Sequence, residues 1–471
     1  MKGFRHFILS KHELIMSHGP NRGMVKLRNS NAVIILVLIL IASGLHLVGS
    51  ETEPEIKLEL IWEGDIPEGV QNVIFLDEKG YNVFSVQCED SEGALRDKRI
   101  LMVEGSRLRY YEGEGMELVR EVELRGGHVV ISKNGRNIVT IEGLERDTMK
   151  EGGYIDKPAV LRLYRWDGEE LGEGEISPGG WGYIFLYPLG NDKAIAVSKI
   201  GNDGTDYQIS MFIREGKLLR EVFKADGQYP TGVFDYAEDG SAAFFVYTSW
   251  DVPRKKRVRY VERVVIDGEG KEIVRYGYRH PGWAGWVSPR GRYLVEVTRG
   301  KYLVIRERGG RLIAEHHVQG EGNYYAAFSP DERYLGVTPG PWKVYFFETE
   351  TGRLLWEYAD RSEMTHFSSV AILPSLRLLF AGRSEAVLKP GQFKGSIDEL
   401  NRRVIENETK DRSIYLLANG HLMRVLGPFP GEGYETQLQA PDLRISKDGK
   451  SLLVTTPRKF FIYSIITGKG Q

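Results

Sequence analysis

The stretch AAFSPDERYLGVTPGPWKVYFFETETGRLLWEY, residues 326–358, holds four apolar runs separated by turn residues. An Asp-containing turn separates the first two runs, and the Thr-Gly turn at 351–352 separates the last two. Short runs rich in aromatic and branched residues, bounded by Gly, Pro and Asp, are typical of antiparallel strands. This stretch therefore predicts a four-stranded antiparallel sheet.

The first half of this unit, two apolar runs around a turn, recurs along the chain after residue 55. Asn-Gly, Asp-Gly and Arg-Gly pairs at several of the turns supply the positive-φ positions that tight hairpins need. We predict eight hairpins: VIFLDEKGYNVFSV (73–86), VVISKNGRNIVTI (129–141), IFLYPLGNDKAIAV (184–197), VFDYAEDGSAAFFV (233–246), GWVSPRGRYLVEV (285–297), AAFSPDERYLGV (326–337), VAILPSLRLLFA (370–381) and LRISKDGKSLLV (443–454).

A third apolar run follows each hairpin, and a fourth follows all but the last. An unmatched run, IKLELIWEG at 56–64, stands before the first hairpin. Pairing of residues 56–62 with the last run would complete the final unit and close a ring, which leaves only short, protected edges. The sequence thus predicts an all-β fold, an eight-bladed β-propeller over residues 56–471. A seven-bladed ring stays open as the alternative, because the repeats are unequally spaced.

Two short motifs resemble those of known propeller families. SPDERYLGV (329–337) and SKDGKSLLV (446–454) resemble the Ser-Pro-Asp-Gly segment of WD40-like propellers. ETETGRLLWEY (348–358) resembles the Thr-Gly-Lys-x-x-Trp segment of pyrroloquinoline-quinone-type repeats, which often build eight blades. The resemblance covers about residues 56–471 and implies a propeller architecture. It does not extend to the vicinal cysteines of many quinone-dependent dehydrogenases, because Cys88 is the single cysteine.

The N-terminal part differs in composition from the rest. Residues 1–31 are basic, and residues 32–49 read AVIILVLILIASGLHLVG, with His46 as their one ionisable side chain. Such a length lies at the lower edge for a membrane-spanning helix, and the basic flank would keep the N-terminus inside. Small residues at 43, 44, 49 and 50 also fit a cleaved signal peptide. We expect one hydrophobic helix, either a signal-anchor or a signal peptide, and an exported body in both cases.

Charge and cysteine content exclude some partners and bonds. The formal net charge is −2, and because the N-terminal part is basic, the body is mildly acidic. Such a body lacks the basic footprint of a nucleic-acid-binding protein, so no nucleic-acid partner is expected. One cysteine allows no intrachain disulfide.

In a propeller, the loops from strand four to strand one and from strand two to strand three share one rim, where function concentrates. These loops are rich in large aromatic side chains, which suit protein, peptide or glycan ligands. The alternative is that the rings fill gaps between blades. The candidate ligand-binding residues are Trp181, Tyr183, Tyr229, Trp283, Trp286, Tyr324, Tyr325, His366, Phe367 and Tyr434.

Long loops between second and third strands lie on the same rim: 89–99, 145–158, 249–259 and the insertion 384–412. One of them is basic and would suit an anionic partner, although a solvated loop explains it too. Its residues are Arg254, Lys255, Lys256, Arg257 and Arg259. Within the insertion, Asn407 begins a glycosylation sequon.

Motifs that carry chemistry are missing from the sequence: it has no Gly-x-Ser-x-Gly elbow, His-Glu-x-x-His helix, Walker loop or Cys/His cluster. We therefore predict no catalytic residue, metal site or cofactor. The favoured function is a non-catalytic binding module at the cell envelope, held at the membrane by its N-terminal helix or secreted after cleavage. A propeller enzyme, either a carboxylate-based glycosidase or lyase or a quinone-type dehydrogenase, and a structural envelope component remain alternatives.

Overall fold

The computed structural model describes residues 56–468 with gaps at 66–69, 76–82, 88–90, 97–98, 105–106, 113–116, 135, 144–157, 166, 177–183, 191, 201–205, 229–231, 252–257, 278–281, 299–300, 320–323, 340–341, 361–364, 386–410, 430–440, 447 and 457–458. The basic segment 1–31 and the predicted helix at 32–49 lie outside the described residues. Across the described ranges, no helix has the length and hydropathy needed to cross a membrane.

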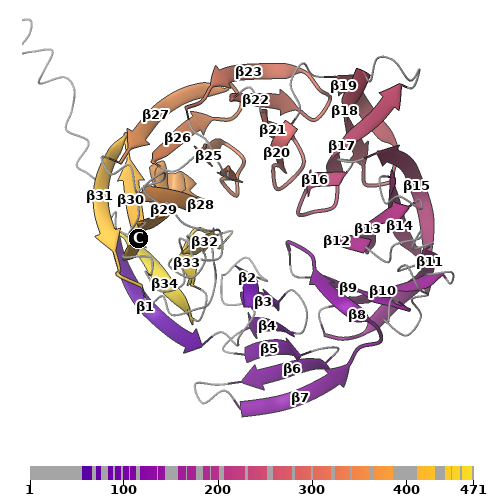
Figure 1. The fold of residues 1–471 in the computed structure, drawn as a ribbon. Coiled ribbons are helices and arrows are strands. Elements are labelled where there is room, and N and C mark those ends of the chain that lie inside the picture. Colours follow the sequence, from indigo (N-terminus) through magenta and orange to yellow (C-terminus); the bar gives the residue numbers. More distant parts are fainter. Residues whose placement is uncertain are drawn as a thin grey trace, which may run out of the picture. The chain divides into compact units, whose positions relative to one another are not determined.

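The described part is all-β, and its strands form antiparallel groups placed around a common axis (Figure 1). The strands form seven hydrogen-bonded sheets, one of which has eight strands; we describe its two four-stranded halves separately and so number the groups along the chain as sheets 1 to 8. Sheet 1 contains β2 (Val70–Phe75), β3 (Val83–Gln87), β4 (Ser91–Arg96), β5 (Arg99–Glu104), β6 (Arg107–Glu112) and β7 (Glu117–Glu123). Sheet 2 contains β8 (Gly127–Ile131), β9 (Asn137–Glu142), β10 (Ala159–Arg165) and β11 (Glu170–Ile176).

Sheet 3 contains β12 (Ile184–Leu189), β13 (Lys193–Ile200), β14 (Asp206–Glu215) and β15 (Leu218–Gln228), and it joins sheet 2 through one parallel pair, Glu173 with Leu218. Sheet 4 contains β16 (Gly232–Tyr236), β17 (Ala242–Asp251), β18 (Val258–Asp267) and β19 (Glu272–Gly277). Sheet 5 contains β20 (Gly282–Val287), β21 (Tyr293–Thr298), β22 (Tyr302–Glu307) and β23 (Leu312–His317).

Sheet 6 contains β24 (Tyr325–Phe328), β25 (Tyr334–Thr338), β26 (Lys343–Glu348) and β27 (Arg353–Ala359). Sheet 7 contains β28 (Thr365–Leu373), β29 (Leu378–Glu385), β30 (Asp411–Ala418) and β31 (His421–Leu426), with the 3₁₀ turn η2 (Pro374–Leu376) between its first two strands. Sheet 8 contains β32 (Asp442–Ile445), β33 (Ser451–Thr455), β34 (Lys459–Thr467) and β1 (Ile56–Asp65).

Each predicted hairpin is present as an antiparallel pair, from β2–β3 in sheet 1 to β32–β33 in sheet 8. The prediction of a loop at 89–99 is wrong, because β4 and β5 occupy these residues and make sheet 1 six-stranded. β4 has little apolar signal, with only Ala94 and Leu95, whereas β5 contains the apolar run 100–103, which the four-run repeat did not count.

The first strand of the chain completes the last sheet. β1 pairs antiparallel with β34, from Ile56 opposite Thr467 to Asp65 opposite Lys459. The side chains support this register, because Ile56 and Leu58 pack on the same apolar cluster as Ile465. The segment 56–62 and the last strand therefore lie side by side, as the sequence predicts.

The core lies between sheets. Strands β25 and β33 are buried at every position, which is possible only if the sheet is covered on both faces. In β25, Leu335 and Val337 pack toward sheet 5, while Tyr334 packs toward sheet 7. The same alternation links the other neighbouring pairs from sheets 2 and 3 to sheets 7 and 8.

The turns between first and second strands share one serine-based geometry in four sheets. A completely buried serine ends the first strand, and its Oγ accepts the N–H of the residue five positions later at 2.9–3.0 Å. In three of these turns the same hydroxyl also donates to the Asn or Asp two positions later. The serines are Ser132, Ser288, Ser329 and Ser446.

Neighbouring turns are bonded to one another. The Ser241 hydroxyl of sheet 4 donates to the Arg290 carbonyl of sheet 5 at 3.1 Å. The Arg290 N–H in turn donates to Glu332 of sheet 6 at 2.6 Å, and Glu332 also pairs with Arg292. Glu332 is 1% exposed and has φ of 63°, in a turn position where sheets 4, 5 and 8 have glycine. The two contacts to sheet 5 account for a glutamate at a position that disfavours any side chain.

We expect Ser329→Ala to lower the free energy of unfolding by about 1–3 kcal/mol, because it leaves the buried N–H of Tyr334 without its acceptor. The measurement is denaturant unfolding of the variant and of Ser375→Ala, which alters an exposed serine in the corresponding turn of sheet 7. Equal stability of the two variants would contradict the role given to the serine hydroxyl.

Candidate functional site

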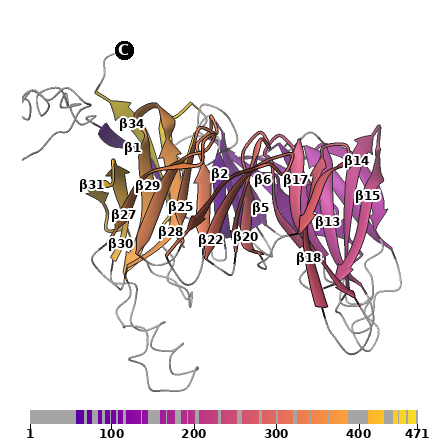
Figure 2. The same ribbon diagram turned by 90° about the horizontal axis from the view of Figure 1, so that it is seen from above.

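The two faces of the sheets carry different connections. The turns between strands one and two and between strands three and four share the turn face, and the other connections share the opposite loop face. Figure 2 shows this side view, in which β17 and β18 extend past their neighbours toward the loop face. β29 ends and β30 begins on the loop face too.

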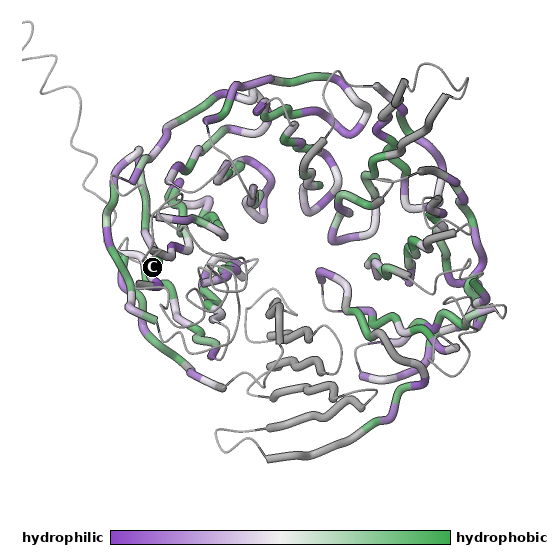
Figure 3. The backbone as a smooth tube through the Cα atoms, in the orientation of Figure 1, coloured by the Kyte–Doolittle hydropathy of each residue, from purple (hydrophilic) through white to green (hydrophobic). Residues whose placement is uncertain are grey.

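On the turn face, neighbouring sheets are also in contact at their outermost strands. In sheets 4 to 7, the glycine of the turn between strands three and four lies against the outermost strand of the preceding sheet, where a Cβ would lie 2.3–3.0 Å from the nearest atom. These glycines have positive φ and are Gly270, Gly310, Gly352 and Gly420. Apolar residues are concentrated in the strands whose faces pack against a neighbouring sheet (Figure 3). The turn face is therefore packed for contact between sheets.

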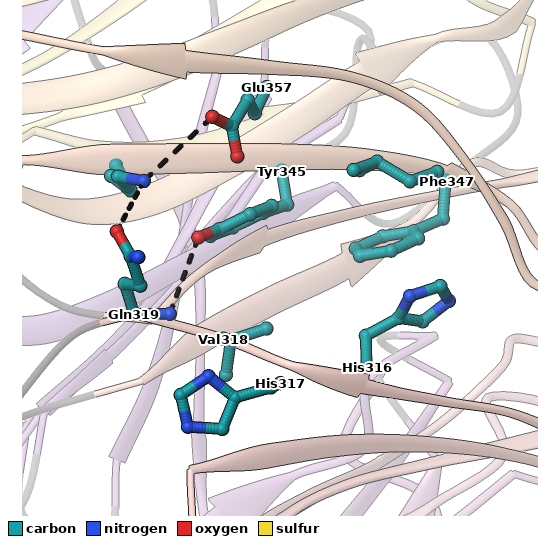
Figure 4. Close-up of a pocket in the computed structure, with 9 residues that line it drawn as sticks. His316, His317, Val318, Gln319, Tyr345, Phe347 and Glu357 are labelled. Atoms are coloured by element: carbon teal, nitrogen blue, oxygen red, sulfur yellow. Dashed lines mark hydrogen bonds and ion pairs between the residues drawn. The ribbon is translucent and has the colours of Figure 1, made fainter.

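A groove lies between sheets 5 and 6, toward the loop face. It has a volume of about 220 Å³ and is lined by the end of β23 with the residues that follow it, and by β26 and β27 (Figure 4). The lining residues are His316, His317, Val318, Gln319, Lys343, Tyr345, Phe347, Leu354 and Glu357. Polar groups from three strands thus converge above an apolar floor.

Lys343 is the cation of this groove. Its Nζ donates to Oε1 of Gln319 at 2.7 Å and lies 3.8 Å from Oε1 of Glu357. The N–H of Gln319 donates to the hydroxyl of Tyr345 at 3.3 Å, which fixes the segment after β23 against sheet 6. The rings of Tyr345 and Phe347 stack with centroids 6.2 Å apart and form the floor.

The two histidines of the groove have different neighbours. Nε2 of His316 lies 2.7 Å from the carbonyl oxygen of Gly352, and its ring centroid lies 5.0 Å from that of Phe347. His317 is more exposed and packs edge-on against Tyr302, its partner across the strand pair. The two rings therefore face different neighbours, as expected for adjacent residues of a strand. Among the residues whose placement is described, no group of three or more His, Cys, Asp and Glu could hold a metal.

Two buried charge clusters lie between other sheets. Arg263 of sheet 4 and Glu296 of sheet 5 form an ion pair in which both side chains are almost completely buried. Burial raises the pKa of Glu296, against the opposite effect of the Arg263 guanidinium. Since both charges are enclosed, the pair joins the sheets and offers no surface to a ligand.

The second cluster lies at the base of the insertion. Asp360 accepts hydrogen bonds from Nε of Arg383 at 3.0 Å and from the hydroxyl of Thr365 at 2.9 Å. The Arg383 guanidinium lies 5.1 Å from the ring centroid of Tyr415. Burial, followed by the charge of Asp360, raises the pKa of Tyr415 to about 12. The cluster therefore holds the strands on either side of residues 386–410 in fixed positions.

Several predicted ligand-binding residues pack in the core. Trp286 lies in β20 and Tyr324 just before β24, and both pack on the apolar cluster between sheets 5 and 6. Tyr325 and His366 are half-buried within β24 and β28. Phe367 is 0% exposed, with Tyr358 and Tyr415 edge-on against its ring. The expected rim position of Phe367 is therefore wrong, because alternation along β28 turns it into the core.

The structure describes the other predicted residues only in part or not at all. Trp283 lies in β20 and Arg259 in β18, and for both only the backbone is described. The rest lie outside the described residues: Trp181, Tyr183, Tyr229, Tyr434, Arg254, Lys255, Lys256, Arg257 and Asn407. Their roles stay predictions.

The groove residues Lys343, Gln319 and Glu357 were not predicted from the sequence. The sequence offered one signal for them, the polar segment EHHVQG at 315–320, at the end of a predicted strand, together with the run of polar and apolar residues WKVYFFE at 342–348. The distance in sequence between these segments hides their proximity.

Neither a protein-family model nor a curated protein sequence matches this chain. Among solved structures, it is similar to the β-propeller domain of Cps50 (Swd1) from Myceliophteria thermophila, with 12% identity and a TM-score of 0.41. It is also similar to BamB from Moraxella catarrhalis, with 11% identity and a TM-score of 0.47. Each match covers 87% of this chain and 100% of the other. The chain has a β-propeller architecture, as its own sheets and their order indicate.

We expect stability to depend on the protonation of His366. Burial lowers the pKa of this histidine below its usual value, so the folded state favours the neutral ring. As the pH falls below the unfolded pKa, the unfolded state binds the proton first. Stability present above that pH is therefore lost, by at most about 1.4 kcal/mol per pH unit.

The measurement is urea unfolding at pH 7.5 and pH 5.5 for the wild type and for His366→Gln. The two proteins differ only at residue 366, so the difference between their pH dependences isolates His366. An equal loss of stability in the two proteins would show that the buried ring does not contribute.

Proposed function

We propose that this chain is an exported, membrane-tethered β-propeller of eight blades that binds a segment of a partner protein on its loop face, without catalysis. The observation that carries the proposal is the difference between the two faces. Buried serines and contacts between sheets occupy the turn face, whereas the loop face bears long and unequal connections. Loops of that kind on a rigid scaffold are where binding surfaces concentrate.

The proposal of eight blades counts the two halves of the eight-stranded sheet, sheets 2 and 3, as separate blades. Each contains four strands in the same order, and one parallel residue pair links them. The pairing of β1 with β34 supplies the fourth strand of sheet 8. We take this pairing as the device that closes the ring, because it ties the two ends of the propeller sequence into one sheet.

Export and tethering are supported by the sequence. The apolar stretch 32–49 follows a basic segment and precedes β1. A retained helix of this kind would hold the propeller at the outer surface, while cleavage would release it.

We expect the propeller to lie outside the cell. The test replaces Cys88 by Ser, which removes the single cysteine, and introduces Arg333→Cys on the exposed turn face. A membrane-impermeant maleimide should label this cysteine in intact cells as fully as in lysed cells. Labelling only after lysis would contradict export, and labelled protein in the medium instead of the membrane fraction would indicate a cleaved signal.

We expect partner contacts on the loop face. A photo-crosslinking residue is placed at Trp342 or Ala359, which are exposed at the loop-face ends of β26 and β27, and in matched proteins at Arg333 or Lys450 on the turn face. After irradiation of membranes, the same protein adduct should form at least fivefold more from the loop-face sites. Equal yields from both faces would contradict the proposal, and an adduct removed by glycosidases would indicate a glycan ligand.

A further inference from the structure

We propose that the groove between sheets 5 and 6 binds a carboxylate of a peptide segment, with Lys343 as the group that recognises it. This inference deepens the proposed function, because it names the chemistry of the partner at one place beside the loop face. The carboxylate belongs either to an Asp or Glu side chain or to a chain terminus.

The environment of Lys343 carries the inference. Its side chain is 15% exposed, so much of its hydration is lost. Its Nζ donates a hydrogen bond to the neutral amide oxygen of Gln319, and the carboxylate of Glu357 at 3.8 Å is beyond hydrogen-bond distance. A partly desolvated ammonium gains most from a charged acceptor at short range. An incoming carboxylate supplies that acceptor.

Three enclosed arginines in the described ranges have such an acceptor from within the protein, whereas Lys193, which is 18% exposed, has its carboxylate neighbour Glu269 at 3.7 Å. Arg383 is bonded to Asp360 at 3.0 Å, Arg263 is bonded to Glu296, and Arg162 is bonded to Glu142 at 2.9 Å. Lys343 differs from these arginines, because the nearest oxygen of its carboxylate neighbour Glu357 lies 3.8 Å from Nζ. Glu357 is half-exposed and free to turn away toward solvent.

The space beside Lys343 suits a small group. Between sheets 2 and 3 the outermost strands meet directly, with Gly174 against Leu219, and fill the corresponding gap. Between sheets 5 and 6 that gap is a groove of about 220 Å³. Because small-molecule pockets usually measure about 300–1,000 Å³, this one suits the end of a peptide or one side chain.

The walls of the groove match such a ligand. Val318 and Leu354 are apolar and would contact the methylene groups of a Glu side chain or the last residue of a chain. His317 is exposed at the same groove and offers a ring nitrogen as a second donor. Cation, donor and apolar wall thus lie within one small volume (Figure 4).

The test uses the full chain in mild detergent, with ¹³C-labelled histidine observed by NMR. The probes are N-acetylglutamate amide, which has a side-chain carboxylate, N-acetylglutamine, which has a terminal carboxylate, and the neutral N-acetylglutamine amide. We expect saturable shifts of His316 and His317 with at least one acid and none with the neutral probe. The responding acid identifies the source of the carboxylate, and no response to either acid overturns the proposal.

Variants assign the response to the lysine. Lys343→Met keeps the apolar stem and should abolish the shifts, whereas Lys217→Met, in the exposed turn before β15, should leave them unchanged. Glu357→Gln removes the competing carboxylate and should tighten binding at least threefold, and it tests the proposal even if Lys343→Met fails to fold. Shifts that survive Lys343→Met in a folded protein, or unchanged binding in Glu357→Gln, contradict the inference.

Failure here is separable from failure of the proposed function. If the acids do not bind but loop-face cross-links persist, the groove proposal falls and the loop-face proposal stands. If the acids bind and the cross-links are equal on both faces, the reverse holds.

Discussion

The middle strands of sheets 2 to 8 carry apolar side chains on both faces, and this property requires that each of these sheets is covered on both sides. In β25 the five residues Tyr334–Thr338 are all buried, some against sheet 5 and some against sheet 7. Burying a large apolar side chain is worth about 1.5–3 kcal/mol, so an uncovered face would lose several such contributions. Neighbouring sheets supply this cover, and the pairing of β1 with β34 places residues 56–65 in the same sheet as residues 459–467.

Contacts near the turns fix how neighbouring sheets face one another. Sheets 5 and 6 are separate antiparallel units, so directional contacts add to their apolar packing. The Glu332 carboxylate of sheet 6 provides such contacts, since it accepts the Arg290 N–H and pairs with Arg292, both of sheet 5. The left-handed backbone of Glu332 costs roughly 1 kcal/mol, which these buried contacts offset. Local strain is here tied to the geometry of an interface.

Much of this fold could be predicted from the sequence, because its signals are local. Hairpins such as 326–337 and 443–454 show in the alternation of turn residues and apolar runs, and the structure contains them. The pairing of 56–62 with the last strand was predictable since one unit lacked a strand. Strands β4 and β5 were missed, because β4 is mostly polar and the apolar run of β5 exceeds the four runs of the repeat. Phe367 was misplaced for a related reason: the start of β28 was taken as a loop, so its alternation was not applied.

The groove illustrates what local signals cannot show. Lys343 begins a strand whose alternation is plain in the sequence, yet its surroundings come from residues after β23 and from β27. A lysine on a strand can be paired, solvated or left with a distant carboxylate. Which of these occurs depends on its distance from residues of other strands, and the pattern of its own strand does not encode that distance. The same repeat that builds the core thus produces gaps of different kinds between sheets. Where outer strands meet, as at Gly174 and Leu219, the gap is filled, and where they stay apart, as beside Lys343, a polar recess forms. In a repeat fold the conserved geometry of the units supports stability, so the departures between units are where recognition is most readily built.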